Sequence, residues 1–364
     1  MDISDVYVIA EAGVNHNGKK ELALRLIDKA ASARSDAVKF QTFKTDKLVS
    51  GLAAQAEYQI KNTGKPQTQY EMLRALELPY GDFVELSKYC EKQGIEFLST
   101  AFDDESLRFL IDECGIKKIK ISSGDIHNVS LLTVAARSNL PIILSTGMST
   151  MEDISLAMQL LASVYKGNNH PKFSDLSPSL LTEAKCLLSK KVTLLHCTTE
   201  YPAPPEDINL LALKAMREYS GLPVGLSDHS EGIIAAIGAA ALGVSIIEKH
   251  FTLDRTMKGP DHKASLNPDE LAEMIRSIRL VTRMLGSSNK QISPSEIKNI
   301  HVARKSLHSV LKINEGESFS EDNLGIKRPG SGISPLYYWD IIGTRAKKAY
   351  DCDQLISEKE MTDR

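Results

Sequence analysis

Hydrophobic and polar positions follow one repeating pattern from Val6 to about Gly286. A short apolar run ends in polar residues, a loop follows, and a segment with helically spaced apolar residues leads into the next run. This alternation is typical of a parallel sheet whose strands are joined by helices. It predicts strands at Val6–Gly13, Ala37–Phe43, Glu96–Phe102, Lys118–Gly124, Pro141–Gly147, Val192–Thr198, Val224–Ser230 and Ser245–Thr252.

Eight strands in about 250 residues predict an α/β fold of the closed (β/α)8 type, the TIM barrel. An open doubly wound sheet is the alternative, but it usually has fewer strands and a G-x-G-x-x-G turn after the first one. That motif is missing from the sequence, so we expect a barrel over residues 1–286. Its helices are expected at Lys20–Ala33, Gly81–Gln93, Ser106–Glu113, Met151–Val164, Gly232–Leu242 and Pro268–Leu285.

Two segments interrupt the pattern. Gly51–Gln69 is polar and long enough to fold over the mouth of the barrel as a lid, although a passive surface loop fits the same composition. Tyr165–Lys191 contains turn signals, and then a short helix is expected at Ser179–Ser189. After the barrel, residues 287–300 are a polar linker, and the short β-like runs of residues 301–364 predict a small second domain.

Composition limits the partners more than the fold. The 364 residues carry 44 Lys and Arg against 47 Asp and Glu, a formal net charge of −3, which is too balanced to indicate a nucleic-acid or membrane-surface protein. The five cysteines are scattered and include no C-x-x-C pair, so neither disulfides nor a zinc ribbon is predicted. Without a signal peptide or a long uncharged apolar stretch, we expect a cytoplasmic protein that acts on a small molecule.

Polar side chains stand at the carboxyl ends of the predicted strands, where the catalytic groups of a barrel gather. Residues two apart on a strand share a face, so we expect His229 and His250 to reach the mouth from neighbouring strands. Two imidazoles with carboxylates nearby suit a divalent cation, while hydrogen-bonded structural histidines are the alternative. The polar residues at or near the carboxyl ends of the predicted strands are Glu11, Lys39, Gln41, Ser99, Thr100, Lys120, Ser122, Ser123, Ser145, Thr146, His196, Ser227, Asp228, His229, Glu248, Lys249 and His250.

Lys39 and Lys120 lie within otherwise apolar strands, where an unpaired ammonium group costs free energy. A bound phosphate would relieve that cost, with Ser123 and Ser227 as further hydrogen-bond donors. Two alternatives stay open. The lysines could pair with internal carboxylates, or one of them could form a Schiff base, as in barrel aldolases.

Longer motifs run through almost the whole chain. They are IAEAGVNHNG at 9–18, VKFQTF at 38–43, FLSTAFD at 97–103, KISSGD at 120–125, LSTGM at 144–148, LHCTTEYP at 195–202, GLSDH at 225–229, EKHFTLD at 248–254, GPDHKAS at 259–265 and KRPGSG at 327–332. With these motifs the chain resembles the sialic acid synthase family, which includes N-acetylneuraminate, legionaminate and pseudaminate synthases. The last motif is similar to the antifreeze-like (SAF) module of that family, a β-clip fold.

The resemblance implies roles for individual residues. Phosphoenolpyruvate would be bound by Lys39, Lys120, Ser123, Tyr201 and Ser227, and Thr100 would be a further substrate-binding residue. A divalent metal, Mn²⁺ ahead of Mg²⁺ or Co²⁺, would be held by His229 and His250. The catalytic and sugar-facing groups would be Glu11, Gln41, Asp125 and Asp261. The resemblance also implies a homodimer with swapped C-terminal domains, in which Arg328 reaches the acylamido group of the partner's sugar.

The implied reaction joins phosphoenolpyruvate to an open-chain sugar. C3 of phosphoenolpyruvate attacks the sugar aldehyde, water directed by Glu11 adds at C2, and phosphate leaves with C–O cleavage. Asp125 departs from the family pattern, which is expected to have Glu there, so its role depends on a water bridge or a shifted substrate.

The acceptor defines the alternatives. N-Acetylmannosamine, which gives N-acetylneuraminate, is expected ahead of a diacetamido-6-deoxy hexose, which gives legionaminate or pseudaminate. An aldose phosphate would require a second basic cluster that the sequence does not show. A carbohydrate-binding protein without catalysis would be expected to lack the metal and phosphate groups.

Overall fold

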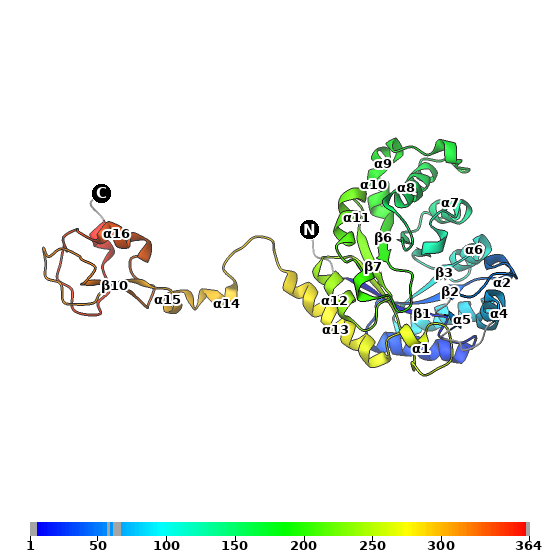
Figure 1. Cartoon of the computed structure of the whole chain (residues 1–364), viewed down its shortest axis with the longest axis horizontal. Coiled ribbons are helices and arrows are strands. Elements are labelled where there is room, and N and C mark those ends of the chain that lie inside the picture. Colours follow the sequence, from blue (N-terminus) through cyan, green and yellow to red (C-terminus); the bar gives the residue numbers. More distant parts are fainter. Residues whose placement is uncertain (1–5, 57–58, 61–66, 362–364) are drawn as a thin grey trace. The chain divides into compact units, whose positions relative to one another are not determined.

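The chain divides into two compact units, residues 1–286 and 287–364 (Figure 1). The computed structural model describes residues 6–56, 59–60 and 67–361. Residues 57–58 and 61–66 of the expected lid lie outside the described residues, so the lid stays a prediction.

The first unit is a barrel. Among its described residues, eight parallel strands pair in chain order, and β8 closes the ring by pairing with β1. The strands are β1 Tyr7–Gly13, β2 Ala37–Thr42, β3 Glu96–Ala101, β4 Ile119–Ile121, β5 Ile142–Ser145, β6 Val192–Cys197, β7 Val224–Asp228 and β8 Ile246–His250. The predicted (β/α)8 fold is therefore confirmed. Several strands end earlier than the pattern predicts, because the chain turns there into the loops that carry the site, as at the 3-10 turn η1 (Ser123–Asp125) after β4.

Helices surround the strands in Figure 1. They are α1 Lys20–Ser32, α2 Thr45–Leu48, α4 Gln69–Leu76, α5 Tyr80–Gln93, α6 Asp104–Asp112, α7 Val129–Arg137, α8 Met151–Tyr165, α9 Ser179–Glu183, α10 Lys185–Lys191, α11 Ala212–Ser220, α12 Ile234–Ala241 and α13 Pro268–Leu285. The expected ranges do not include α2, α4, α7 or α11, although Thr68 and Glu71 form a capping box at the start of α4. The helix expected at Ser179–Ser189 is divided into α9 and α10. None of the described helices is both long and apolar enough to span a bilayer.

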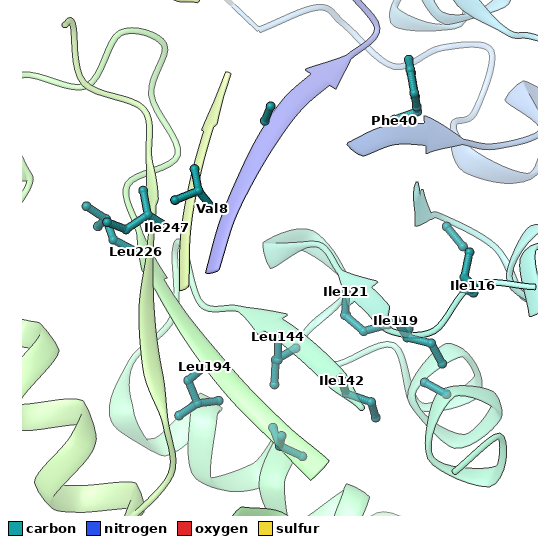
Figure 2. Close-up of a cluster of buried hydrophobic side chains, with 14 of the residues drawn as sticks. Val8, Phe40, Ile116, Ile119, Ile121, Ile142, Leu144, Leu194, Leu226 and Ile247 are labelled. Carbon is teal, nitrogen blue, oxygen red and sulfur yellow. The ribbon is translucent and has the colours of Figure 1, made fainter. Parts of the chain in front are cut away.

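Two apolar layers hold the barrel, because alternate strand residues face opposite sides. The interior layer consists of Ile9, Ala37, Leu98, Ile143, Leu195 and Ile246. The other faces pack against the helices and include Val8, Phe40, Ile121, Leu144, Leu226 and Ile247, which Figure 2 shows on their strands. Most residues of the interior apolar layer precede a polar residue of the site by two positions on the same strand. The layer therefore forms an apolar floor beneath the site.

The second unit has its own small core around Leu307, Phe319 and Tyr350. Strands β9 (Ser306–Ser309) and β10 (Leu324–Lys327) are antiparallel, and isolated bridges such as Ile313 with Tyr350 add further β pairing. The helices are α14 Pro294–Ile297, α15 Ile300–Ala303 and α16 Tyr338–Ile341, with 3-10 turns η5 Pro335–Tyr337 and η6 Glu358–Met361. Helix α14 lies within the segment expected to be a linker. The assignment of this unit as an antifreeze-like module stays a prediction.

Candidate active site

Four charged side chains meet inside the barrel, directly above its apolar floor. Each of Glu11, Lys39, Lys120 and Glu248 is at most 4% exposed. Lys39 Nζ lies 2.8 Å from Glu11 Oε2 and 3.7 Å from Glu248 Oε2, and Lys120 Nζ lies 3.2 Å from Glu248 Oε1. The internal ion pairs left open by the sequence are therefore present. They join residues of β1, β2, β4 and β8 across the barrel.

Two hydroxyl groups complete this charged cluster. Lys39 Nζ donates a hydrogen bond to Thr100 Oγ1 at 2.9 Å, and Ser227 Oγ donates to Glu248 Oε1 at 2.9 Å. Register explains the placement, since Thr100 pairs with Lys120 and Ser227 pairs with Glu248 in the sheet. The structure thus brings together four of the eight predicted substrate-binding residues, Lys39, Thr100, Lys120 and Ser227.

The two buried carboxyl groups, Glu11 and Glu248, have pKa values shifted in opposite directions. Burial raises the pKa of Glu11 to about 7, because the charge of Lys39 only partly compensates the lost solvation. Burial also opposes ionisation of Glu248, but the charges of Lys120 and Lys39 outweigh it and hold the pKa of Glu248 at about 2. Near neutral pH, Glu248 is an anion and Glu11 exchanges a proton readily.

Burial lowers the pKa of Lys120, whereas Glu11 and Glu248 outweigh burial and raise the pKa of Lys39. With Lys39, Lys120 and Glu248 charged, the cluster is neutral when Glu11 is ionised and has a net positive charge when Glu11 is protonated. Such a cluster suits an anionic substrate.

His229 and His250 approach each other at the ends of β7 and β8. Their ring centroids are 5.6 Å apart, and the ring of Tyr201 lies 4.2 Å from that of His229. His229 Nδ1 is 2.6 Å from the carbonyl oxygen of Thr198. Because a carbonyl only accepts, Nδ1 carries the proton and Nε2 keeps a lone pair, which lies 3.2 Å from the Tyr201 hydroxyl.

The histidine pair fits a divalent metal ion. Burial lowers the pKa of His229 to about 4 and the pKa of His250 well below its usual range, so both rings are neutral, the form that binds metals. Nδ1 of His250 is buried without a hydrogen-bond partner among the described residues. No cluster of three or more His, Cys, Asp or Glu ligands occurs in the described part of the chain, so water and substrate would have to fill the remaining positions.

A second cradle forms around Gly147, at the turn after β5. The Gly147 amide donates to Ser123 Oγ at 2.9 Å, and Ser123 Oγ lies 3.1 Å from Cys197 Sγ. A methyl group at Gly147 would lie 2.3 Å from Thr199 Oγ1 and 2.9 Å from Cys197 Sγ. Only glycine leaves these polar atoms room to converge. Burial raises the pKa of Cys197, so this side chain is a thiol.

Sequence reasoning did not assign Ser145 or Gly147 to the site. Ser145 Oγ is buried with no hydrogen-bond partner among the described residues. Its inward direction could have been read from the alternation on β5, because Ile143, two residues earlier, belongs to the interior layer. Nothing in the local sequence reveals the close packing around Gly147.

Two of the sugar-facing candidates, Glu11 and Gln41, border the same space as His250. A methyl group at Gly13 would lie 3.3 Å from Glu11 Oε1, 3.4 Å from Gln41 Nε2 and 3.4 Å from His250 Cε1. Asp261, in the loop after β8, is buried, and burial alone raises its pKa to about 6. The carboxyl groups of Glu11 and Asp261 suit proton transfer near neutral pH.

Asp125 and Arg328 make other contacts. Asp125 Oδ2 accepts from Ser122 Oγ at 2.6 Å and Oδ1 accepts from Asn128 Nδ2 at 3.0 Å, so its carboxylate shapes the turn after β4. Arg328 belongs to the second unit, where its Nε donates to the carbonyl oxygen of Ala303 at 3.0 Å. The roles predicted for these two residues stay predictions.

Comparison with known proteins gives consistent results. The NeuB family model matches residues 26–290. An N,N'-diacetyllegionaminic acid synthase of Campylobacter jejuni is 44% identical over 351 residues, which cover 96% of this chain and 98% of the relative. A synthase of the same name from Legionella pneumophila is 42% identical and covers 93% of this chain and 90% of its own. A crystal structure of N-acetylneuraminic acid synthetase from Leptospira borgpetersenii aligns with a TM-score of 0.66 and 33% identity, over 82% of this chain and 91% of that one.

Proposed function

The chain belongs to the NeuB family, whose members are phosphoenolpyruvate-dependent nonulosonic acid synthases, and from that premise we propose that it makes N,N'-diacetyllegionaminic acid from phosphoenolpyruvate and 2,4-diacetamido-6-deoxy-mannose. The choice of acceptor is carried by the similarity to two N,N'-diacetyllegionaminic acid synthases, at 44% and 42% identity. Support for the N-acetylmannosamine acceptor expected from the sequence is weaker, since the N-acetylneuraminic acid synthetase is 33% identical. We therefore propose N,N'-diacetyllegionaminate as the product in place of the N-acetylneuraminate that is expected from the sequence. Membership of a family of synthases also removes the non-catalytic alternative.

Phosphoenolpyruvate is bound through the buried lysines. Its phosphate and carboxylate accept hydrogen bonds from Lys39 and Lys120, with hydroxyl donors from Ser123 and Ser227. This assignment is supported by the burial of both lysines and by the lowered pKa of Lys120, because an anion compensates the desolvation of a buried ammonium group. A Schiff base at Lys120 is the rival use of that lowered pKa.

Glu11 moves the proton in the second half of the reaction. C3 of phosphoenolpyruvate forms a bond to the aldehyde carbon of the sugar, and positive charge develops at C2. Water adds at C2 and gives a proton to Glu11, after which phosphate leaves as the C–O bond breaks. A carboxyl group with a pKa of about 7 is matched to accept this proton and return it at physiological pH.

His229 and His250 would hold the divalent ion. When bound there, the ion supplies Lewis-acid polarisation of the sugar aldehyde. Gln41 and Asp261 orient the sugar beside the histidines. The ring of Tyr201 lies against that of His229 at a tilt of 32° and limits the movement of the imidazole.

The second unit completes the acceptor site in a partner chain. We assign to this unit an antifreeze-like fold and a swapped position in a homodimer, with Arg328 donating to an acylamido oxygen of the sugar. The support is the KRPGSG motif at 327–332 and the exposed position of the Arg328 side chain.

An acceptor panel tests the proposed function through phosphate release. The purified chain is supplied with phosphoenolpyruvate, Mn²⁺ and one of three sugars: 2,4-diacetamido-6-deoxy-mannose, N-acetylmannosamine or N-acetylmannosamine 6-phosphate. We expect kcat/KM for the diacetamido sugar to exceed that for N-acetylmannosamine by at least about 10-fold, because a site built to hydrogen-bond a second amide discriminates strongly against a sugar that lacks it. Higher kcat/KM with N-acetylmannosamine would restore the neuraminate reading.

Lys118, two residues before Lys120, provides a matched control for the role of Lys120. Lys120→Met should abolish phosphate release, whereas Lys118→Met should retain it, because Lys118 pairs with Glu96 at the amino-terminal end of the barrel. Borohydride added during turnover should leave the enzyme active, since no imine forms. A reduced adduct at Lys39 or Lys120 would replace anion binding with Schiff-base chemistry.

A further inference from the structure

Behind the two histidines lies a second ion pair that the reaction does not use. Asp228 lies between Ser227 and His229 on β7, and Lys249 lies between Glu248 and His250 on β8. Since strand residues alternate in direction, both point away from the barrel interior, toward the layer of helices. Each is 1% exposed, and Lys249 Nζ lies 2.8 Å from Asp228 Oδ2.

Asp228 and Lys249 also form hydrogen bonds with Ser230, the residue that follows His229. Asp228 Oδ1 accepts from the Ser230 amide at 2.8 Å and from Ser230 Oγ at 2.6 Å. Lys249 Nζ donates to the Ser230 carbonyl oxygen at 2.6 Å. Both backbone polar groups of Ser230 are therefore held by the ion pair. On the other side of His229, its own carbonyl oxygen accepts from the Ala203 amide at 2.9 Å.

Stability alone does not account for charges at these positions. Removing two charges from water costs several kcal/mol for each ion, and well-packed apolar side chains are often equally stabilising. The preceding outward pair on the same strands is apolar, because Leu226 faces the helices beside Ile247. An ion pair is what fixes a unique register, a use for which buried charges are well attested.

Register is what the histidine pair requires. Asp228 is the direct sheet partner of Lys249. A slip of β8 by one residue would separate the two charges inside an apolar layer and would turn His250 away from the barrel interior. The free-energy cost of the unpaired charges therefore opposes the one displacement that would dismantle the histidine pair.

We propose that the Asp228–Lys249 pair, together with Ser230, is a positioning device that fixes β7 against β8 and so sets the spacing of His229 and His250 for a divalent metal ion. The inference rests on the metal role in the proposed function. Asp228, Lys249 and Ser230 are positioning residues, because they act through the histidines and touch neither the metal nor the substrate.

The test measures metal binding by the full-length chain. Asp228→Asn/Lys249→Met removes both charges with little change of volume, so no unpaired charge stays buried. Loss of such a supporting contact typically weakens metal binding about 10- to 100-fold, and we expect the Kd for Mn²⁺, measured from the electron paramagnetic resonance of free Mn²⁺, to rise by that factor. The visible d–d spectrum of the Co²⁺-loaded variant should also change, which a loss of stability alone would not produce.

The control is an ion pair at the opposite end of the barrel. Lys118→Met/Glu96→Gln removes a pair joined at 2.6 Å that has no contact with β7. This control should keep the wild-type Mn²⁺ affinity even if its unfolding temperature falls. If the Asp228→Asn/Lys249→Met protein does not fold, Ser230→Ala is used, since it removes only one hydrogen bond and should weaken Mn²⁺ binding about 2- to 5-fold.

The outcomes separate the two proposals. If the wild type binds Mn²⁺ and His229→Ala abolishes binding, the metal role is supported. If the Asp228→Asn/Lys249→Met variant, or Ser230→Ala in its place, then keeps the wild-type affinity and the wild-type Co²⁺ spectrum, the positioning role is wrong. Absence of Mn²⁺ binding by the wild type would overturn the metal role and the inference with it.

Discussion

Single side chains show how burial sets protonation in this protein. His16 and His262 are buried near the barrel mouth, and burial lowers the pKa of each to about 4. His262 Nε2 lies 3.1 Å from Asn17 Oδ1 and its Nδ1 lies 2.7 Å from Thr252 Oγ1. His16 Nδ1 accepts from the Gly18 amide at 3.1 Å. These contacts suit neutral rings that order the loop after β1.

Stability should therefore fall as the pH is lowered from about 6.5 toward 4. In this pH range the two histidines bind protons in the unfolded chain but not in the folded chain. The free energy of unfolding therefore rises with pH, and the contribution of the histidines reaches its full value above about pH 6.5. A single histidine of this kind costs about 2 kcal/mol at pH 5. In His16→Gln, denaturant unfolding should show a difference between pH 7 and pH 5 that is smaller by about this amount.

The matched control for this measurement is His170→Gln. His170 is exposed, so its removal should leave the difference between the two pH values unchanged. An equal difference in wild type and His16→Gln would show that His16 is protonated at little cost in the folded protein.

At the scale of elements, the turn between β5 and α8 gathers groups from three strands. The Gly147 amide contacts Ser123 from the turn after β4, and its Cα faces Cys197 and Thr199 from the end of β6. A parallel barrel makes this possible, because the carboxyl ends of neighbouring strands meet on one rim. Because Gly147 has no side chain, this turn leaves room for the polar groups of the neighbouring strands to converge.

Gly147→Ala should damage phosphoenolpyruvate binding more than it damages the fold. The added methyl group would lie 3.0 Å from Ser123 Oγ and closer still to Thr199 Oγ1, so these side chains must move. Such overpacking typically costs about 1–3 kcal/mol of stability. We expect the KM for phosphoenolpyruvate to rise at least about 10-fold, measured by phosphate release beside a thermal unfolding curve.

Gly81→Ala is the control, since a methyl group at Gly81 has no atom within 4 Å. Its kinetics should match those of the wild type, and its unfolding temperature should stay the same or rise, because Gly81 lies in helix α5 and alanine favours a helix over glycine. If Gly147→Ala binds phosphoenolpyruvate normally, the cradle around Gly147 does not form part of that site.

At the scale of the whole molecule, the barrel holds the buried charges and the histidines, while Arg328 belongs to the second unit. Arg328 is exposed, and Arg345 is exposed on the same unit with a comparable contact, a hydrogen bond from Nη1 to the Gly316 carbonyl oxygen at 2.9 Å. The two arginines therefore form a matched pair for testing whether the second unit acts on the acceptor.

Arg328→Ala should raise the acceptor KM by roughly 10- to 150-fold, the equivalent of a charge-assisted hydrogen bond of about 1.5–3 kcal/mol. Arg345→Ala should leave it unchanged, and the KM for phosphoenolpyruvate should move little in both. Mixing Arg328→Ala chains with His229→Ala chains should recover up to half of the activity, because a mixed dimer pairs one intact barrel with one intact second unit. Inactive mixed dimers, verified by mass, would contradict action in trans.

The sequence by itself determined the barrel and placed the candidate site at the carboxyl ends of its strands. Strand and helix periods differ, so the eight-fold alternation could be read locally, and register places residues such as Lys39, Lys120, His229 and His250 at the carboxyl rim. Motif resemblance supplied the family. The exact strand ends, helix α4 and the division of α9 from α10 escaped, because these depend on caps and turns that override a periodic pattern.

Only the tertiary structure decided what the side chains do to one another. The sequence shows two lysines in apolar strands, but their pairing with Glu11 and Glu248 requires four strands to meet across the barrel. The same holds for the cradle at Gly147 and for the pair Asp228 and Lys249. Distances between segments far apart in the chain, and the loss of water that shifts each pKa, exist only once the barrel is closed.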